Sequence, residues 1–137
     1  MKKIKIILAI GIFTLVGMSL TNGDGSRWVA PKSASTVKNP LKGNTAATAE
    51  GKKLYGQMCA VCHGAKGKGD GVAGMSLSPK PANFTKEIIQ AQTDGAIYWK
   101  LTTGRTPMAG YEKSLTDKQR WGLVNYIRTF KKVSKKK

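Results

Sequence analysis

The stretch Cys59-Ala60-Val61-Cys62-His63 decides how this sequence is interpreted, because it holds both cysteines and the single histidine of the chain. Two thiols three positions apart lie on the same side of a helical turn, so each can add to one vinyl group of a haem. The histidine directly after the second cysteine is then held beside the porphyrin, where its imidazole can bind iron. The pattern therefore predicts one covalently attached haem c.

Other roles for these cysteines explain the pattern less well. A disulfide between Cys59 and Cys62 would close too short a loop to stabilise much. A thioredoxin-like redox pair requires a βαβ setting, which the surrounding sequence does not offer. A zinc site made of Cys and His needs four ligands, and the chain has only three such residues.

Outward from this motif, the sequence predicts an all-α domain over residues 46–131, because no segment sustains the period-two alternation of a strand. Helices are expected at 46–60, 85–93 and 94–103, with a glycine-rich loop at 64–74. The last helix begins with a capping box, Thr116-Asp117-Lys118-Gln119. A domain this small buries little surface, so a cofactor is expected to contribute to its stability.

These features together resemble a small class I cytochrome c. The resemblance covers residues 46–130 and continues past the attachment motif through Gly67–Gly71, Leu77–Phe84 and Gly104–Met108 to the final helix. It implies a helical fold around one haem, in which the first and last helices cross at a small residue and aromatic side chains. The matching positions here are Gly51, Tyr55, Trp121 and Tyr126.

A methionine is the candidate for the sixth iron ligand opposite His63, because the chain has no second histidine. Met1 and Met18 lie in the N-terminal apolar segment, and Met58 neighbours the attachment motif on the side of His63. This leaves Met75, in the glycine-rich loop, and Met108, which follows a Gly-x-x-Pro turn and matches the axial position of the family. The alternative is that Met108 only packs against the ring and the sixth site is open.

The resemblance also implies supporting contacts to the haem and its ligand. A proline carbonyl in the loop after the motif commonly accepts a hydrogen bond from the ligating histidine, and either Pro79 or Pro81 would match that position. Trp99 and Arg105 are candidates for hydrogen bonds to the haem propionates, although packing and a solvated surface explain these side chains equally well.

The N-terminal part of the sequence has the composition of an export signal. Residues 1–20 combine basic Lys2, Lys3 and Lys5 with an uncharged stretch, and no A-x-A cleavage site follows. We therefore expect a signal peptide or an uncleaved membrane anchor, and a protein in the periplasm or on the outer face of the cytoplasmic membrane. Residues 21–45 are predicted to be a flexible linker, and residues 132–137 a lysine-rich tail.

The predicted function is that of a one-electron carrier and not an enzyme, because a His/Met-ligated haem leaves no site for substrate. The alternatives are a subunit or tethered domain of a larger respiratory complex, and a peroxidase or gas-binding haem protein with an open sixth site. The net charge of +17 favours redox partners with acidic docking surfaces, and possible contact with a membrane, whereas an exported haem protein would not meet nucleic acid. The basic residues expected near the haem edge are Lys66, Lys68, Lys80, Arg105 and Lys113.

Overall fold

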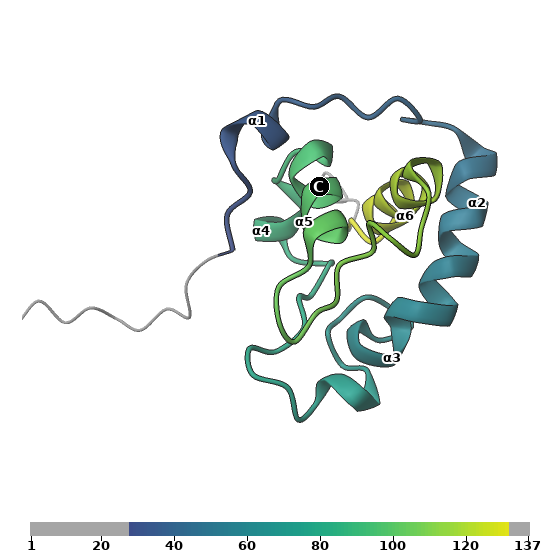
Figure 1. The fold of residues 1–137 in the computed structure, drawn as a ribbon. Coiled ribbons are helices and arrows are strands. Elements are labelled where there is room, and N and C mark those ends of the chain that lie inside the picture. The colour runs from purple at the N-terminus through teal and green to yellow at the C-terminus, as the bar shows by residue number, and fades with distance from the viewer. Residues whose placement is uncertain (1–27, 132–137) are drawn as a thin grey trace, which may run out of the picture.

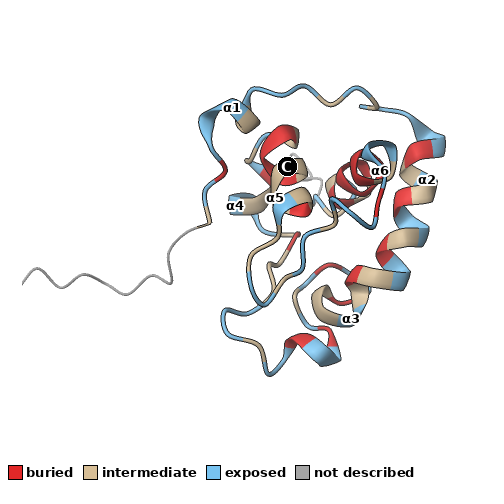
Figure 2. Cartoon of the chain, viewed as in Figure 1, coloured by how far each residue is buried: buried red, intermediate tan, exposed pale blue. Residues whose placement is uncertain are grey.

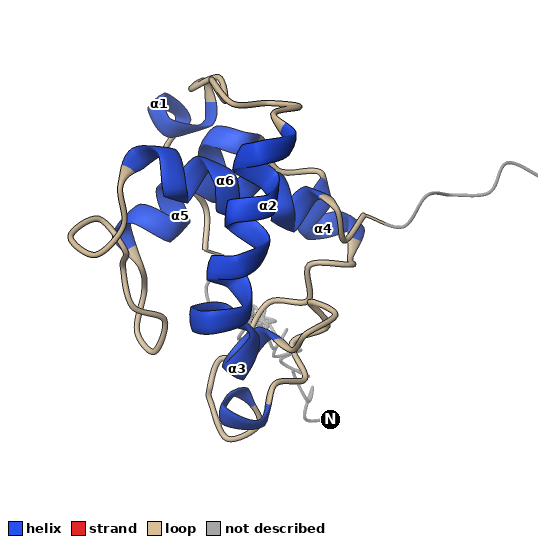
Figure 3. Cartoon of the chain, turned by 90° about the vertical axis from the view of Figure 1, so that its right-hand side faces the viewer, coloured by secondary structure: helices blue, strands red, loops and turns tan. Residues whose placement is uncertain are grey.

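A computed structural model describes residues 28–131 as helices joined by loops, with no strand in this range (Figures 1 and 3). The all-α prediction is confirmed. No helix among residues 28–131 is long and apolar enough to cross a membrane. The predicted export segment, 1–20, and the predicted tail, 132–137, lie outside the described residues. The elements are α1 (Lys32–Ser35), α2 (Thr45–Leu54), the π-helical η1 (Tyr55–Cys59), α3 (Ala60–His63), the 3-10 turn η2 (Val72–Gly74), α4 (Glu87–Gln90), α5 (Asp94–Thr103) and α6 (Asp117–Arg128).

The fold is organised by the crossing of α2 over α6, where two glycines meet. A Cβ atom placed on Gly51 would lie 2.0 Å from the Gly122 carbonyl oxygen, so the two backbones touch. Beside this crossing the rings of Tyr55 and Tyr126 pack edge to face, with centroids 5.2 Å apart. The expected crossing at Gly51, Tyr55 and Tyr126 is present, whereas Trp121 stacks on Tyr98 of α5, with centroids 4.0 Å apart.

The hydrophobic core lies between α2, α5 and α6, whose facing sides are buried (Figure 2). Leu123 and Val124 of α6 have no exposed surface. The start of α6 is fixed by the predicted capping box, in which Thr116 and Gln119 each accept a hydrogen bond from the other's backbone N–H. This local pattern therefore positions the helix that carries most of the core.

Two predicted helices differ from the structure in detail. The helix expected at 46–60 runs from Thr45 to His63 but widens to a π-helix at Tyr55–Cys59, immediately before the second half of the attachment motif. Single π turns inside helices occur frequently at functional sites, because the extra residue redirects the side chains that follow. The helix expected at 85–93 is shorter, and only α4, Glu87–Gln90, is helical.

Residues 28–44, part of the predicted flexible linker, are instead packed on the folded domain. We call this segment the strap. Its backbone runs so close to α5 that a Cβ atom on Gly95 would lie 2.2 Å from the Ala34 carbonyl oxygen. The Asn39 amide donates to Asp94 at 3.0 Å and to Asn125 at 2.8 Å. These long-range contacts fix the strap to α5 and α6, so the ordered domain begins well before residue 46.

Candidate functional site

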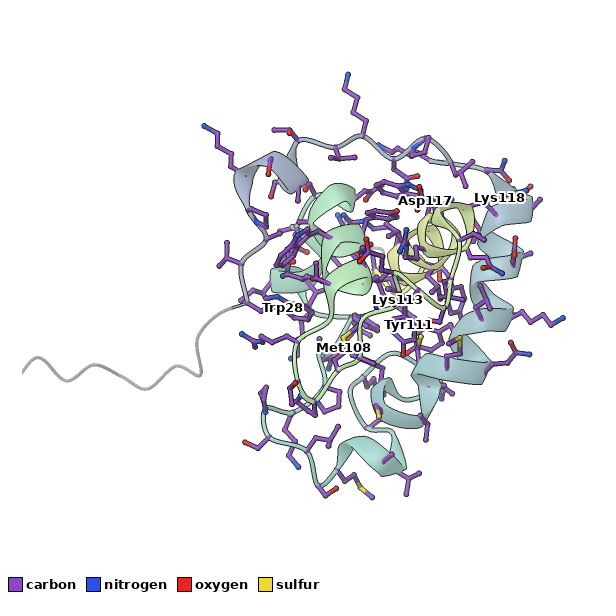
Figure 4. The ribbon with its side chains drawn as sticks, viewed as in Figure 1. Trp28, Met108, Tyr111, Lys113, Asp117 and Lys118 are labelled. Carbon is purple, nitrogen blue, oxygen red and sulfur yellow. The ribbon has the colours of Figure 1, made fainter. Side chains whose placement is uncertain are left out.

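The predicted site residues line one cavity of about 450 Å³, which lies within the size range of cofactor sites. Cys59 enters it from η1, Cys62 and His63 from α3, and Met108 from the loop after α5. Most of the remaining lining is apolar, and half of the remaining lining residues come from α4, α5 and the loop at 77–82. Figure 4 shows Met108 and Tyr111 on the stretch between α5 and α6.

Both cysteines at the cavity are free thiols, as haem attachment requires. Cys59 is buried and Cys62 is half-buried. Burial, followed by the charge of Cys62, raises the pKa of the Cys59 thiol to about 11. The thiol is therefore protonated at ordinary pH, so this pair lacks the low-pKa thiolate that is typical of a redox-active cysteine pair.

The His63 ring is held by a backbone carbonyl. Its Nδ1 lies 3.0 Å from the Ala82 carbonyl oxygen, and because that oxygen can only accept, Nδ1 carries the proton. The other ring nitrogen is then left with its lone pair free for a metal. The expectation that Pro79 or Pro81 supplies this carbonyl is corrected, because the acceptor belongs to the residue after Pro81. Burial lowers the pKa of His63, opposed by this hydrogen bond, so the imidazole favours the neutral form.

Met108 is positioned by a tight turn. Arg105 and Met108 exchange both backbone hydrogen bonds, at 2.9 and 2.8 Å, and this bridge directs the chain back over the cavity. Met75 does not line the cavity, and its side chain is 61% exposed. Met58 does line the cavity, from the turn that also carries Cys59. The structure thus places His63 and Met108, which are 45 positions apart in the sequence, on the same cavity.

Two contacts that sequence reasoning missed shape the site around His63. The Tyr55 hydroxyl, buried at the end of α2, donates to the Gly64 carbonyl oxygen at 2.8 Å and so fixes the turn that follows the motif. Phe84 stacks on the His63 ring, with centroids 4.5 Å apart and planes at 16°. Both aromatic residues are visible in the sequence, but nothing in their neighbourhood along the chain identifies these partners.

The cavity edge carries basic and aromatic side chains. Arg105, a predicted propionate contact, lines the cavity together with Lys100 and Lys80. Trp99 is not part of the lining, but it packs against Trp28 of the strap, with ring centroids 6.2 Å apart.

The donor set fits a covalently bound haem better than a metal ion held by side chains alone. Paired thiols, an imidazole with a free nitrogen and a thioether surround an apolar space. Among residues 28–131, no group of three or more His, Cys, Asp and Glu side chains could hold a metal by itself. The apolar lining would provide a surface for the faces of a porphyrin, which would supply the iron that His63 could bind.

Comparison with known proteins agrees with this chemistry. Residues 46–127 match the model of the family described as cytochrome C oxidase, cbb3-type, subunit III. No curated protein sequence matches the chain. The structure is similar to a chain of the Kuenenia stuttgartiensis reducing HAO-like protein complex Kustc0457/Kustc0458, with a TM-score of 0.59 and 28% sequence identity. The match covers 79% of the present chain and 53% of that chain. The present chain thus spans about half the length of that protein.

A second similar structure is the KustC0563 c-type cytochrome, with a TM-score of 0.52 and 30% identity over 60% of the present chain and 98% of the other. The family match extends over more than half of the sequence and contains the complete attachment motif. The chain therefore belongs to the c-type cytochrome family described as cytochrome C oxidase, cbb3-type, subunit III, and its domain is an electron carrier with a covalently bound haem c.

Proposed function

We propose that the chain is a one-electron carrier whose haem is attached through Cys59 and Cys62 and whose iron is ligated by His63 and Met108. The observation that carries this proposal is the shared cavity: Met108 lines it with His63, whereas Met75 is largely exposed and lies outside the lining. Met58 is an implausible opposite ligand because it is adjacent to Cys59 on the turn that leads to His63.

The protein's own contribution is to hold both ligands with little freedom to move. The Ala82 carbonyl keeps the proton of His63 on Nδ1, and the two-bond bridge from Arg105 keeps the backbone of Met108 in place. The haem, when bound, supplies an iron that alternates between ferrous and ferric states, and a methionine ligand raises its reduction potential. Fixed ligands and an apolar lining favour electron transfer without rearrangement, and they leave no position for a substrate.

The axial pair is tested with the isolated holoprotein. Met108→Ala is expected to abolish the sulfur-to-iron charge-transfer band of the ferric form, lower the reduction potential and allow carbon monoxide to bind the ferrous form. Met75→Ala, as the matched control, leaves all three unchanged. Carbon monoxide binding by the unaltered protein would refute Met108 ligation and favour a gas-binding or peroxidase function with an open sixth site.

We further propose that the carrier meets acidic redox partners through the loops around α3 and η2. Exposed Lys66, Lys68 and Lys80 lie in these loops, close in sequence to the exposed apolar side chains of Val72 and Met75. A basic rim around apolar side chains attracts a negatively charged surface and accelerates encounter at low salt, by up to about a thousand-fold.

The docking proposal is tested by stopped-flow electron transfer to an isolated partner oxidase across ionic strength. Replacing Lys66 and Lys68 by Glu is expected to slow the reaction and to weaken its salt dependence. A chain that ends at Phe130, which removes five lysines of the C-terminal segment, should lose less. A rate that does not depend on salt, or a greater loss from the truncation, would contradict this docking face.

The place of action that we propose is outside the cytoplasmic membrane, either in the periplasm or on its outer face. The proposal is supported by the basic and apolar composition of residues 1–20, which is typical of an export segment. A protein whose haem is attached outside the cytoplasmic membrane needs such a segment. N-terminal sequencing of the mature protein distinguishes the two forms: a start at or after residue 20 means a cleaved signal, and a start at Met1 means a retained anchor.

A second candidate function is that of a subunit in a larger redox complex. It is favoured by the family description, which names an oxidase subunit, and by the similar chain of the reducing HAO-like protein complex. Copurification of the tagged holoprotein in stoichiometric amounts with membrane or soluble redox proteins would support this function, whereas a monomer that exchanges electrons in solution supports the free carrier.

A further inference from the structure

The imidazole of His63 is contacted in two ways by one short segment of the loop after η2. The Ala82 carbonyl oxygen lies 3.0 Å from Nδ1, and the Phe84 ring lies nearly parallel to the imidazole, with centroids 4.5 Å apart and planes at 16°. We call Ala82 and Phe84 the clamp. Ala82 holds the edge of the imidazole by a hydrogen bond, and Phe84 covers one of its faces.

Hydrogen bonds fix the backbone of the clamp on both sides of Phe84. The Phe84 backbone N–H donates to the Gly67 carbonyl oxygen at 2.7 Å. The Phe84 carbonyl oxygen accepts a hydrogen bond of 2.7 Å from the side-chain amide of Gln90, which is buried. The same amide nitrogen donates to the Ile127 carbonyl oxygen of α6 at 3.0 Å. The clamp is therefore tied to the loop that follows the attachment motif and to the central helix of the core.

The ring of Phe84 has little room to move. The residue is buried, and the rings of Tyr55 and Phe130 pack against it, each with its centroid 6.2 Å away. The Asn83 side chain, between the two members of the clamp, accepts hydrogen bonds from the backbone N–H and the hydroxyl of Thr85. This local turn fixes the direction in which the ring leaves the backbone.

A hydrogen bond alone does not fix the plane of an imidazole that binds a metal. The bond between a ring nitrogen and a metal is symmetric about its own axis, so the ring can turn around it. The hydrogen bond at Nδ1 permits some of this rotation, because a carbonyl oxygen accepts over a broad range of angles. A flat ring packed on one face removes the remaining freedom, because turning His63 would drive its edge into the carbon atoms of Phe84.

We propose that Phe84 is a positioning residue that fixes the plane of the His63 imidazole about the bond from its Nε2 atom to the haem iron. The inference rests on the proposed ligation by His63 and is independent of which methionine lies opposite. In a ferric haem, the plane of an axial imidazole determines over which part of the porphyrin the unpaired electron is spread. A ring that keeps one plane in both oxidation states limits the rearrangement that accompanies electron transfer.

The haem methyl protons of the cyanide-bound ferric holoprotein provide the readout in proton NMR spectra. Cyanide takes the sixth position in place of a methionine and is symmetric about its bond to iron, so the hyperfine shifts of the methyl groups report the plane of His63. Phe84→Leu and Phe84→Met keep an apolar side chain but remove the flat face. Both should reduce the spread of the methyl shifts or change their order, and Phe84→Tyr, which retains the ring, should preserve both.

The matched control is Phe130→Leu, which removes a ring that packs on Phe84 rather than on His63. It should leave the order and the spread of the methyl shifts unchanged. A pattern that stays the same in Phe84→Leu and Phe84→Met, or that changes equally in Phe130→Leu, would overturn the inference. A measurement that needs no substitution is the temperature dependence in the unaltered protein. The methyl shifts should keep their order and vary linearly with inverse temperature, whereas a spread that collapses on warming would contradict a fixed plane.

The ring protons of His63 separate this inference from the proposed ligation, because they show hyperfine shifts only when the imidazole binds iron. Shifted ring protons together with an unchanged methyl pattern in the Phe84 variants would overturn the role of Phe84 and leave His63 as the ligand. Absence of shifted ring protons in the unaltered protein would refute ligation by His63 and, with it, the inference.

Discussion

Replacing Gly51 by Ala tests whether the crossing of α2 and α6 holds this domain together. The added methyl carbon would lie 2.0 Å from the Gly122 carbonyl oxygen, 2.3 Å from the Gly122 carbonyl carbon and 2.8 Å from the Leu123 nitrogen. The shortest of these distances is about 1.4 Å below the 3.4 Å at which ordinary contact begins. All three atoms belong to the backbone of α6, so a change of rotamer cannot relieve the clash and the helix itself has to move.

The expected loss of stability follows from two opposing effects. Overpacking of a core costs about 1–3 kcal/mol, and a clash with backbone belongs at the upper end, at about 3 kcal/mol. Alanine also favours the helix over glycine by about 1 kcal/mol. The net loss in the free energy of unfolding is therefore about 2 kcal/mol. For a domain of this size it lowers the melting temperature by about 8–16 °C.

Thermal unfolding of the holoprotein, followed by far-ultraviolet circular dichroism, measures this loss. The matched control is Gly56→Ala, in the adjoining turn of the same helix, where an added Cβ atom would have no neighbour within 4 Å. It is expected to melt at or slightly above the temperature of the unaltered protein. Both variants carry the same haem, so their difference reports the crossing. A Gly51→Ala protein as stable as Gly56→Ala would refute the reasoning.

Three further substitutions test other parts of the fold. Asn39→Ala removes the side-chain hydrogen bonds to Asp94 and Asn125. Amide hydrogen exchange should then accelerate across residues 28–44, while the rest of the domain stays as protected as before. An equal acceleration over the whole domain would contradict a separately attached strap. Thr116→Ala removes the N-cap of α6 and should cost about 1 kcal/mol in chemical denaturation, with no loss if the cap is unimportant. Leu123→Ala leaves a cavity at a position with no exposed surface and should cost about 2–5 kcal/mol in the same assay; a loss below 1 kcal/mol would contradict its place in the core.

The features that the sequence predicted correctly are those encoded by neighbouring residues. The bounds of α5, 94–103, follow from a polar start and a glycine stop within one short segment. The capping box of α6 is complete within four residues. The covalently bound haem c, which the family match supports, is predicted by a motif that is more local still, since two thiols and an imidazole within five positions have few chemical uses in common.

The strap could not be predicted, because its order depends on residues far away in the sequence. The partners of Asn39 are 55 and 86 positions distant, and the close approach at Gly95 involves a helix for which the strap sequence carries no signal. Its Gly, Ser, Thr and Asn content is also that of a flexible tether. The composition of the strap indicates that much conformational entropy is lost when it becomes ordered. It does not indicate the long-range contacts that offset this loss.

The carbonyl partner of His63 shows the same limit on a smaller scale. The sequence identified the correct loop, but the acceptor depends on which carbonyl of a Pro-x-Pro-Ala run points inward. Side-chain identity does not determine this, because every residue of the run carries an equivalent carbonyl. The π turn at 55–59 is similar, because the residue pattern of this helix does not distinguish it from ordinary α-helix.

The ordered strap also limits how a membrane-anchored form of the protein could act. A linker over residues 21–45 could extend about 90 Å, but with residues 28–44 packed on the domain only residues 21–27 are left, and they reach at most about 25 Å. An anchor formed by residues 1–20 would therefore hold the domain near the membrane by its Trp28 side. Trp28 lines the same cavity as Lys80 of the proposed docking face. A retained anchor of this length would therefore favour redox partners at the membrane surface over partners free in solution.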